Sequence, residues 1–146
     1  MIEQLDKIDH LEILNDFYKL EKSLNWDIYG LDGNQSKQCD LQHKDERSII
    51  EQISETSIEK YIKYYTLYRT RLMWLGPKAC YSLHKDLYKR IHIPLITNDQ
   101  CFFIFKKGLV QHVPVGYSYL IDSTLEHTAM NGANSWRLHL VGDKRS

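Results

Sequence analysis

The stretch that decides the fold is Tyr88-Lys-Arg-Ile-His-Ile-Pro-Leu95, in which polar and apolar side chains alternate. A period of two residues is typical of a β-strand, because successive side chains point to opposite faces of the sheet. Arg90 and His92 would share one face, and Ile91 and Ile93 the other. The pattern therefore predicts a strand with one apolar face and one face that carries basic side chains.

Similar short segments lie on both sides of this stretch, separated by turns rich in glycine, proline and asparagine. We expect strands at Arg71–Leu75, Tyr88–Leu95, Cys101–Phe105, Leu109–His112, Tyr117–Ile121, His127–Met130 and Arg137–Val141. Many short strands at a spacing of about ten residues indicate a sandwich or barrel. We expect residues 71–146 to form the β core of a single domain, 1–146.

The first 70 residues have a different, helical pattern. Apolar residues recur at three- and four-residue steps from Leu5 onward, which favours a helix that ends near Ser23–Asn25. A second helix is expected from about Ser57, because Thr56-Ser-Ile-Glu59 has the spacing of a capping box. Residues 1–70 are thus expected to be mostly helical and to cover one face of the β core.

Composition narrows the class of protein. The chain has 146 residues, 42% of them hydrophobic, with 19 Lys+Arg balanced by 19 Asp+Glu. This neutral balance argues against a nucleic-acid partner, which would favour a basic face. Apolar runs fall short of the roughly 20 residues that span a bilayer, so no membrane partner is expected. Three cysteines without a paired motif, and no signal-like N-terminus, predict reduced thiols in the cytoplasm.

Three segments carry a polar residue at position i and another at i+2, where a strand would direct both to one face. These pairs are His84/Asp86, Arg90/His92 and Arg137/His139. A solvated outer face is one interpretation. Such faces usually carry Lys, Glu, Thr and Ser, however, whereas His, Asp and Arg bind metals and carboxylates. Three strands of this kind favour a polar cavity between two sheets.

A candidate metal site follows from the first pair. His84 and Asp86 can approach one ion from the same face, and His127 is the best third ligand. Two histidines and one carboxylate make the facial triad of non-haem Fe(II) oxygenases, which leaves positions open for substrates. His43 and His112 are alternative ligands, although neither has a carboxylate two residues later.

Arg137 is a candidate anion-binding residue, ten positions after His127. A guanidinium inside a polar cavity needs an anion, and it can hold a dicarboxylate through a bidentate, charge-assisted pair. The alternative is a structural salt bridge to Asp122, Glu126 or Asp143. The sequence alone leaves both open.

Taken together, these residues resemble a known signature. His84-x-Asp86, then His127, then Arg137 resembles that of the Fe(II)/2-oxoglutarate-dependent oxygenases. Arg90-Ile-His-Ile-Pro-Leu95, and the ending His127-Thr-Ala-Met-Asn131 with Arg137-Leu-His-Leu-Val141, are similar to the aspartyl/asparaginyl β-hydroxylase branch. The resemblance covers roughly Arg71 to Asp143. Asp86 makes the chain similar to small microbial and phage-encoded members, because the animal enzymes lack this carboxylate.

The resemblance implies a fold and a role for each residue. The fold would be a double-stranded β-helix, a relative of the jelly roll and the cupins. The implied roles are Fe(II) binding by His84, Asp86 and His127, binding of the distal carboxylate of 2-oxoglutarate by Arg137, binding of its other carboxylate end by His92, and binding of a substrate carboxylate by Arg90. A small hydroxyl residue that the family places on the preceding strand is not identifiable near Arg71–Trp74.

The resemblance also implies an activity. We expect a dioxygenase that uses Fe(II), 2-oxoglutarate and O2 to hydroxylate a carboxylate-bearing small molecule or peptide, with release of succinate and CO2. A free amino acid, or an Asp-, Asn- or Pro-like residue, would suit Arg90. The location would be cytoplasmic, that of a host cell if the protein is virus-encoded. The main alternative is a non-catalytic cupin-like module that binds a divalent metal and a small carboxylate. Zinc hydrolysis is a weaker third option.

Overall fold

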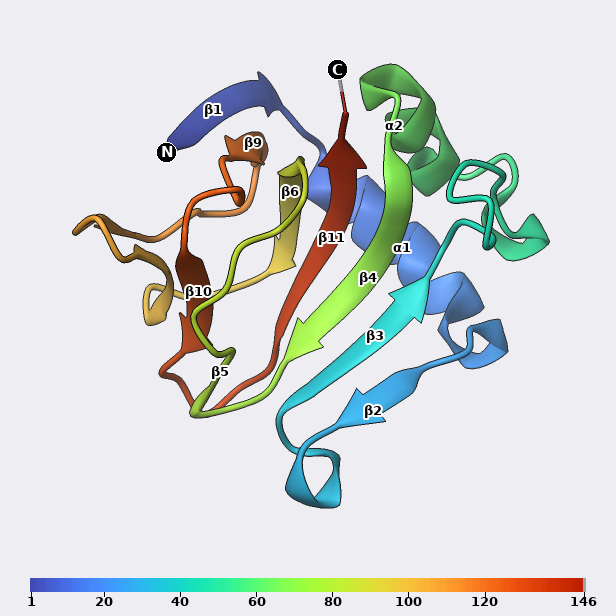
Figure 1. Ribbon diagram of the computed structural model, residues 1–146. Coiled ribbons are helices and arrows are strands. Elements are labelled where there is room, and N and C mark those ends of the chain that lie inside the picture. The colour runs from blue at the N-terminus through green and yellow to red at the C-terminus, as the bar shows by residue number, and fades with distance from the viewer. Residues whose placement is uncertain (146) are drawn as a thin grey trace.

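The computed structural model describes residues 1–145 as two antiparallel sheets that face each other in a double-stranded β-helix (Figure 1). The strands are, in chain order, β1 (Ile2–Lys7), β2 (Asp27–Tyr29), β3 (Ser36–Asp40), β4 (Tyr68–Leu75), β5 (Ala79–Cys80), β6 (Lys89–Ile96), β7 (Cys101–Phe105), β8 (Val110–Gln111), β9 (Tyr117–Ile121), β10 (His127–Asn131) and β11 (Arg137–Lys144). The helices are α1 (His10–Leu20) and α2 (Ser57–Tyr65), with short 3-10 turns at Glu21–Ser23, Leu31–Gly33 and Glu51–Ile53.

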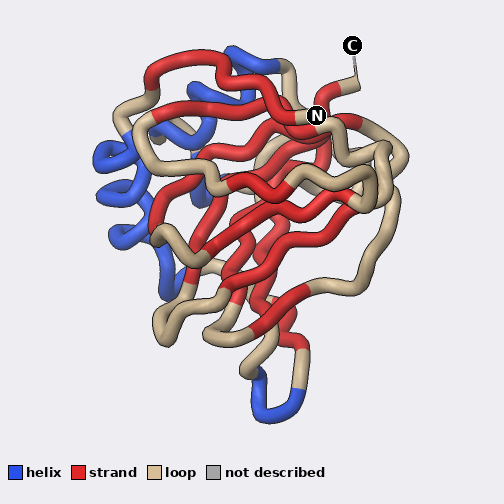
Figure 2. Tube along the Cα trace, turned by 90° about the vertical axis from the view of Figure 1, so that its left-hand side faces the viewer, coloured by secondary structure: helices blue, strands red, loops and turns tan. Residues whose placement is uncertain are grey.

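The two sheets differ in size and in what covers them. The larger sheet has seven strands in the order β1-β9-β6-β11-β4-β3-β2, and the smaller has four in the order β5-β10-β7-β8. The helices stack against one side of the strands (Figure 2). The larger sheet therefore has an outer face that packs on the helices and an inner face that meets the smaller sheet. No helix in residues 1–145 is long and apolar enough to cross a membrane.

The alternating pattern of β6 and β11 determines which side chains reach each face. Leu138, Leu140 and Ile91 are fully buried in the core beneath the helices, which also contains Ile13 and Phe17 of α1. Burial of each such side chain contributes roughly 1.5–3 kcal/mol. The side chains between these apolar positions therefore point to the inner face, where the polar residues gather.

The inner face is assembled by strand register. Val141 lies opposite both His92 of β6 and Arg71 of β4, and His139 lies opposite Met73 of β4. Residues that are directly opposite across strands point to the same face. The basic side chains of three adjacent strands are consequently brought to one surface between the sheets. The predicted polar cavity lies at this surface.

The structure confirms the predicted β fold, and each expected strand is present with ends shifted by a few residues. The first 70 residues are less helical than expected. Ile2–Lys7 forms β1, which pairs with β9, and β2 and β3 extend the other edge of the larger sheet. The helix expected from Leu5 begins at His10, because pairing with β9 takes the preceding residues and Asp9 caps the helix by accepting from the Glu12 N–H at 3.2 Å.

The second helix starts where the sequence predicts. The Thr56 hydroxyl accepts from the Glu59 N–H, and the Glu59 carboxylate accepts from the Glu55 N–H at 2.9 Å. The helix buries Ile58 and Ile62 and ends at Thr66, which has a left-handed backbone with φ of 54°. The capping-box spacing therefore located the helix start correctly, although Glu59 caps one residue earlier than in the standard box.

Candidate active site

Three of the predicted residues meet between the smaller sheet and β6. His84 and His127 form an isolated antiparallel bridge, with both N–H···O distances at 2.9 Å. Their rings lie 4.6 Å apart, centroid to centroid. The backbone N–H of Asp86 donates to the Ser123 carbonyl at 2.8 Å, which holds the intervening loop against the site. The local strand-like geometry of His84 and the loop that follows thus brings residues from distant segments together.

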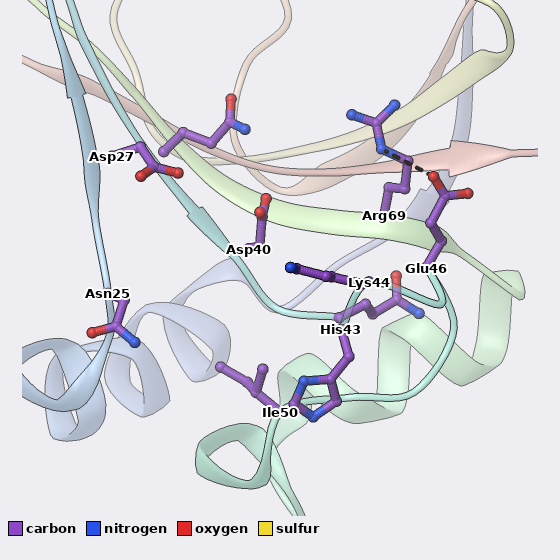
Figure 3. A pocket seen from close by; sticks show the side chains of 10 residues that line it. Asn25, Asp27, Asp40, His43, Lys44, Glu46, Ile50 and Arg69 are labelled. Carbon is purple, nitrogen blue, oxygen red and sulfur yellow. Dashed lines mark ion pairs between the residues drawn. The ribbon is translucent and has the colours of Figure 1, made fainter.

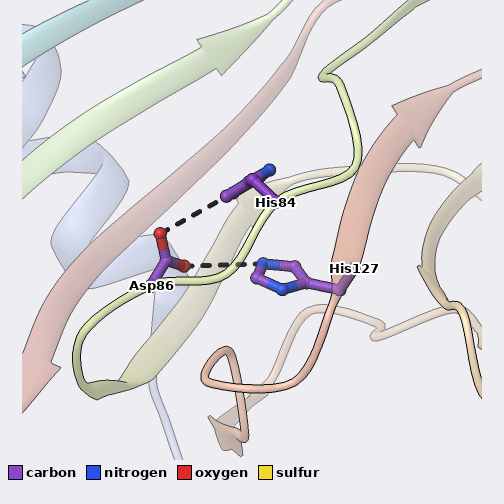
Figure 4. A group of neighbouring side chains, drawn as sticks. All are labelled: His84, Asp86 and His127. Carbon is purple, nitrogen blue, oxygen red and sulfur yellow. Dashed lines mark ion pairs between the residues drawn. The ribbon is translucent and has the colours of Figure 1, made fainter.

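The side-chain atoms of this group could contact a single ion (Figure 4). Oδ1 of Asp86 lies 3.7 Å from Nε2 of His84, and Oδ2 lies 3.5 Å from Nε2 of His127. One ligand atom from each residue lies within 4.8 Å of the other two. Within residues 1–145, no other group of three His, Cys, Asp or Glu residues has such spacing. The donor set of two imidazoles and one carboxylate suits a divalent transition metal.

Both histidine rings are oriented by backbone carbonyls. Nδ1 of His84 lies 2.7 Å from the Ser82 carbonyl, and Nδ1 of His127 lies 2.7 Å from the Leu125 carbonyl. A carbonyl accepts only, so each Nδ1 carries a proton, and each Nε2 faces Asp86 as the atom available to a metal. Burial lowers the pKa of His127, which favours the neutral ring that a metal ligand requires.

Arg90 lies directly beside this group. Its Nη1 is 3.1 Å from Oδ2 of Asp86, and its Nε is 3.3 Å from Oδ1 of Asp143. Asp143 is buried and also lies within 4 Å of the guanidinium groups of Arg69 and Arg145. Arg90, to which the family resemblance assigns the binding of a substrate carboxylate, thus links the candidate metal group to the neighbouring cluster of charged side chains.

A narrow cavity of about 80 Å³ continues from the candidate metal group into the space between the sheets. Its lining consists of Met73, Tyr81, His84, Arg90, His92, Phe103, His127, Ala129 and Arg137. Five of the six predicted site residues therefore line one cavity, and the sixth, Asp86, pairs with three of them. The polar face inferred from the alternating sequence is this cavity wall.

Arg137 is the most unusual residue in the cavity. Its side chain is 3% exposed, its Nε has no hydrogen-bond partner, and it forms no ion pair within residues 1–145. The salt-bridge alternative is not found: Asp143 pairs with other arginines, and Glu126 pairs with Lys106 at 3.3 Å. Burial lowers the pKa of Arg137. A buried cation without a counter-charge is costly, so this site is built to receive an anion.

Tyr81 is a cavity residue that sequence reasoning missed. Its hydroxyl is buried without a hydrogen-bond partner in residues 1–145, and Tyr81 lines the same cavity as Arg137. A hydroxyl was expected on the strand near Arg71–Trp74, but Met73 occupies the cavity wall there. Tyr81 instead enters from just after β5, a two-residue strand too short for a periodic signal. Its hydroxyl and Arg137 offer two donors to one anion.

The two alternative histidines lie elsewhere. His43 lines a separate polar cleft of about 430 Å³ near the edge of the larger sheet (Figure 3). In that cleft Arg69 faces Glu46, with Nε and Oε1 3.8 Å apart. Nδ1 of His112 lies 2.9 Å from the Cys101 carbonyl. Neither histidine belongs to a three-residue ligand group in the described chain.

Comparison with known proteins agrees with the geometry. The model of a family described as aspartyl/asparaginyl beta-hydroxylase matches residues 4–145. The chain belongs to this family. No curated protein matches it closely enough to be informative. The resemblance inferred from the sequence is confirmed over nearly the whole chain, including the N-terminal residues that carried no recognisable motif.

Solved structures share the fold at low sequence identity. An oxidoreductase of the 2OG-Fe(II) oxygenase family from Burkholderia pseudomallei is 11% identical, with a TM-score of 0.68 over 97% of this chain and 84% of its own. A Pseudomonas putida prolyl-4-hydroxylase is 12% identical, with a TM-score of 0.63 over 99% of this chain and 92% of its own. A viral collagen prolyl hydroxylase from Paramecium bursaria Chlorella virus-1 is 12% identical, with a TM-score of 0.59 over 99% and 96%. Family and fold together support an oxygenase-type hydroxylase that depends on Fe(II) and 2-oxoglutarate.

Proposed function

We propose that this protein is an Fe(II)- and 2-oxoglutarate-dependent dioxygenase that hydroxylates a carboxylate-bearing substrate and releases succinate and CO2. The observation that carries the proposal is the unpaired guanidinium of Arg137, buried in the same cavity as His84 and His127. A metal site alone would not need it. A cosubstrate with a free carboxylate at its far end would pair with it and relieve the cost of its burial.

The chemistry of the cavity residues fits Fe(II) and 2-oxoglutarate. His84, Asp86 and His127 would hold Fe(II), since the Nε2 atoms of both imidazoles face the carboxylate while backbone carbonyls hold their Nδ1 atoms. Arg137 and the Tyr81 hydroxyl would hold the distal carboxylate of 2-oxoglutarate, and both are orphaned buried donors. His92 would contact the other carboxylate end, because it lines the same cavity wall. When bound, iron and 2-oxoglutarate would together activate O2 for the hydroxylation of a C–H bond.

A carboxylate on the substrate is supported by the charges next to the candidate iron site. Arg90 lies at the cavity, and Arg71 is 3% exposed with its Nε unpartnered. Burial lowers the pKa of Arg71 to about 10, with smaller contributions from nearby Arg90 and Arg69, so it remains charged at neutral pH. Iron would neutralise the charge of Asp86, so less negative charge would remain to offset the positive charge of these arginines. A free amino acid, or an Asp-, Asn- or Pro-like residue, would provide the missing anion.

The proposal is tested by measuring succinate formation from 2-oxoglutarate in air, with Fe(II) and ascorbate, first alone and then with a panel of amino acids and short peptides. The wild type should form succinate slowly alone and faster with one class of substrate. Asp86→Ala and Arg137→Ala should lose the activity, whereas Asp99→Ala, at an exposed position, should keep it. Metal and carboxylate binding without succinate from any mixture would instead favour the non-catalytic module.

A further inference from the structure

Two histidines on adjacent strands of the larger sheet make direct contact behind the cavity. His92 of β6 and His139 of β11 have their Nδ1 atoms 3.1 Å apart, with the ring planes at 80°. His139 is 1% exposed and His92 is 7% exposed. His92 lines the cavity, whereas His139 is not among its lining residues. The contact therefore joins a cavity residue to a fully enclosed one.

The number of protons in this pair is fixed by the surroundings. Burial, together with the positive charge of Arg137, lowers the pKa of both rings well below the ordinary value. Both imidazoles are therefore neutral, and each carries one N–H. Two nitrogens at 3.1 Å share a single proton, so one ring is protonated at Nδ1 and its partner must be protonated at Nε2.

Burial decides which ring donates. Nε2 of His139 is fully buried and has no hydrogen-bond partner in residues 1–145. If His92 donated, that nitrogen would carry an orphaned N–H, which costs roughly 1–3 kcal/mol. If His139 donates, its Nε2 carries no proton, and Nε2 of His92 becomes an N–H on the cavity side. The second arrangement removes the orphaned donor and adds a donor beside Arg137, where an anion is expected.

We propose that His139 is a positioning residue: its Nδ1–H donates to Nδ1 of His92 and fixes His92 in the Nε2–H form, which donates to a carboxylate of 2-oxoglutarate. The identity of this ligand rests on the proposed function, whereas the protonation pattern of the pair does not. His139 would act only through His92, because it does not line the cavity.

The protonation pattern is read directly in the metal-free protein, residues 1–146, by long-range ¹H–¹⁵N NMR of the histidine rings. We expect a protonated Nε2 and a bare Nδ1 at His92, and the reverse at His139. His139→Asn, whose amide can donate from nearly the same position, should preserve the His92 signal. His139→Leu should change it. A protonated Nδ1 at His92 in the wild type would overturn the proposal.

Binding of 2-oxoglutarate to the Mn(II)-loaded proteins, measured by calorimetry, tests the consequence. His139→Leu should weaken 2-oxoglutarate binding about tenfold to a hundredfold, the effect of losing a hydrogen bond to a charged group. His139→Asn should restore most of it, and Mn(II) affinity should be unchanged in both. Equal losses in both variants would reduce His139 to a packing role.

If His139→Leu fails to fold, the wild-type spectrum and the His139→Asn variant still decide whether the pairing is correct. Failure of the wild type to bind 2-oxoglutarate would overturn the assigned ligand and the proposed function, while the NMR result would still establish or refute the pairing itself.

Discussion

Nη1 of Arg90 lies 3.1 Å from Oδ2 of Asp86, the same oxygen that lies 3.5 Å from Nε2 of His127. A cation thus sits next to the carboxylate proposed to bind iron. It offsets the negative charge of Asp86 in the metal-free protein, and it would compete electrostatically with an incoming metal. Arg90 would therefore connect metal binding to the proposed binding of a substrate carboxylate.

This relationship predicts separate effects of Arg90→Ala on the ligands. Mn(II) affinity should stay equal or increase, because a competing cation is removed. Substrate binding should weaken more than 2-oxoglutarate binding, because Arg90 is proposed to hold the substrate carboxylate. Calorimetry with each ligand in turn measures the three effects. Arg69→Ala is the matched control, since Arg69 contacts Asp143 but not Asp86. Equal weakening of substrate and 2-oxoglutarate binding would exclude this division of roles.

Asp86→Ala should remove Fe(II)-dependent turnover and lower metal affinity by more than about a hundredfold. Loss of a residue that only hydrogen-bonds to a metal ligand typically lowers metal affinity ten- to a hundredfold, and Asp86 is proposed to be a ligand itself. Calorimetry with Mn(II), alongside Asp99→Ala as an exposed control, measures the change. Full activity in Asp86→Ala would show that the ligand assignment is wrong.

Arg137→Met should stabilise the metal-free protein while abolishing 2-oxoglutarate binding. Replacing buried charge with an apolar side chain of similar volume often stabilises a fold by about 1–4 kcal/mol, and Arg137 has no counter-charge to lose. Urea unfolding gives the free energy, and calorimetry gives the binding. Arg47→Met, at an exposed position, serves as the control. A clear loss of stability in Arg137→Met would mean that the guanidinium has a structural partner after all.

The free energy of unfolding should fall as the pH is lowered through about 6.5. His92, His127 and His139 have lowered pKa values in the folded protein, mainly through burial. Below the unfolded-state pKa of about 6.5, the unfolded chain binds protons that the folded protein does not, so stability decreases by up to about 1.4 kcal/mol per pH unit for each histidine. Above that pH both states are neutral and the dependence disappears.

Urea unfolding at a series of pH values, on wild type and His139→Asn, measures this slope. The variant should be less sensitive to acid, because one proton-binding site is gone from the unfolded chain. Identical slopes would indicate that His139 takes up a proton equally readily in the folded and the unfolded protein, in conflict with the neutral pair.

The candidate site was predictable where its signal was local. Arg90 and His92 follow a regular strand alternation, so their shared face follows from the sequence. His84 and Asp86 were expected on one strand face, but His84 forms only an isolated bridge with His127 and Asp86 lies in the loop that follows. His127 was the best candidate for a third ligand from the sequence, with His43 and His112 as alternatives, and the order of motifs in the family resemblance supported it. The structure brings these residues into one site, as the pattern indicated, and their roles toward iron and substrate remain proposals.

The remaining features depend on long-range pairing. Residues of β1 fit a helical period, and only their hydrogen bonds to β9 make them a strand. Tyr81 enters the cavity beside a two-residue strand with no periodic pattern. The contact between His92 and His139 depends on the register of β6 and β11, which shifts between Leu138 and His139. No spacing within a single segment encodes such a shift.

The most direct test of the central claim is an anaerobic titration of the metal-free protein with Fe(II) and 2-oxoglutarate, followed by visible absorption. Chelation of iron by 2-oxoglutarate gives a weak charge-transfer band. We predict this band in the wild type, and its loss or weakening in Asp86→Ala and Arg137→Ala. Fe(II) binding without the band in the wild type would contradict the account, because the cavity would then hold a metal but not the cosubstrate proposed to pair with Arg137.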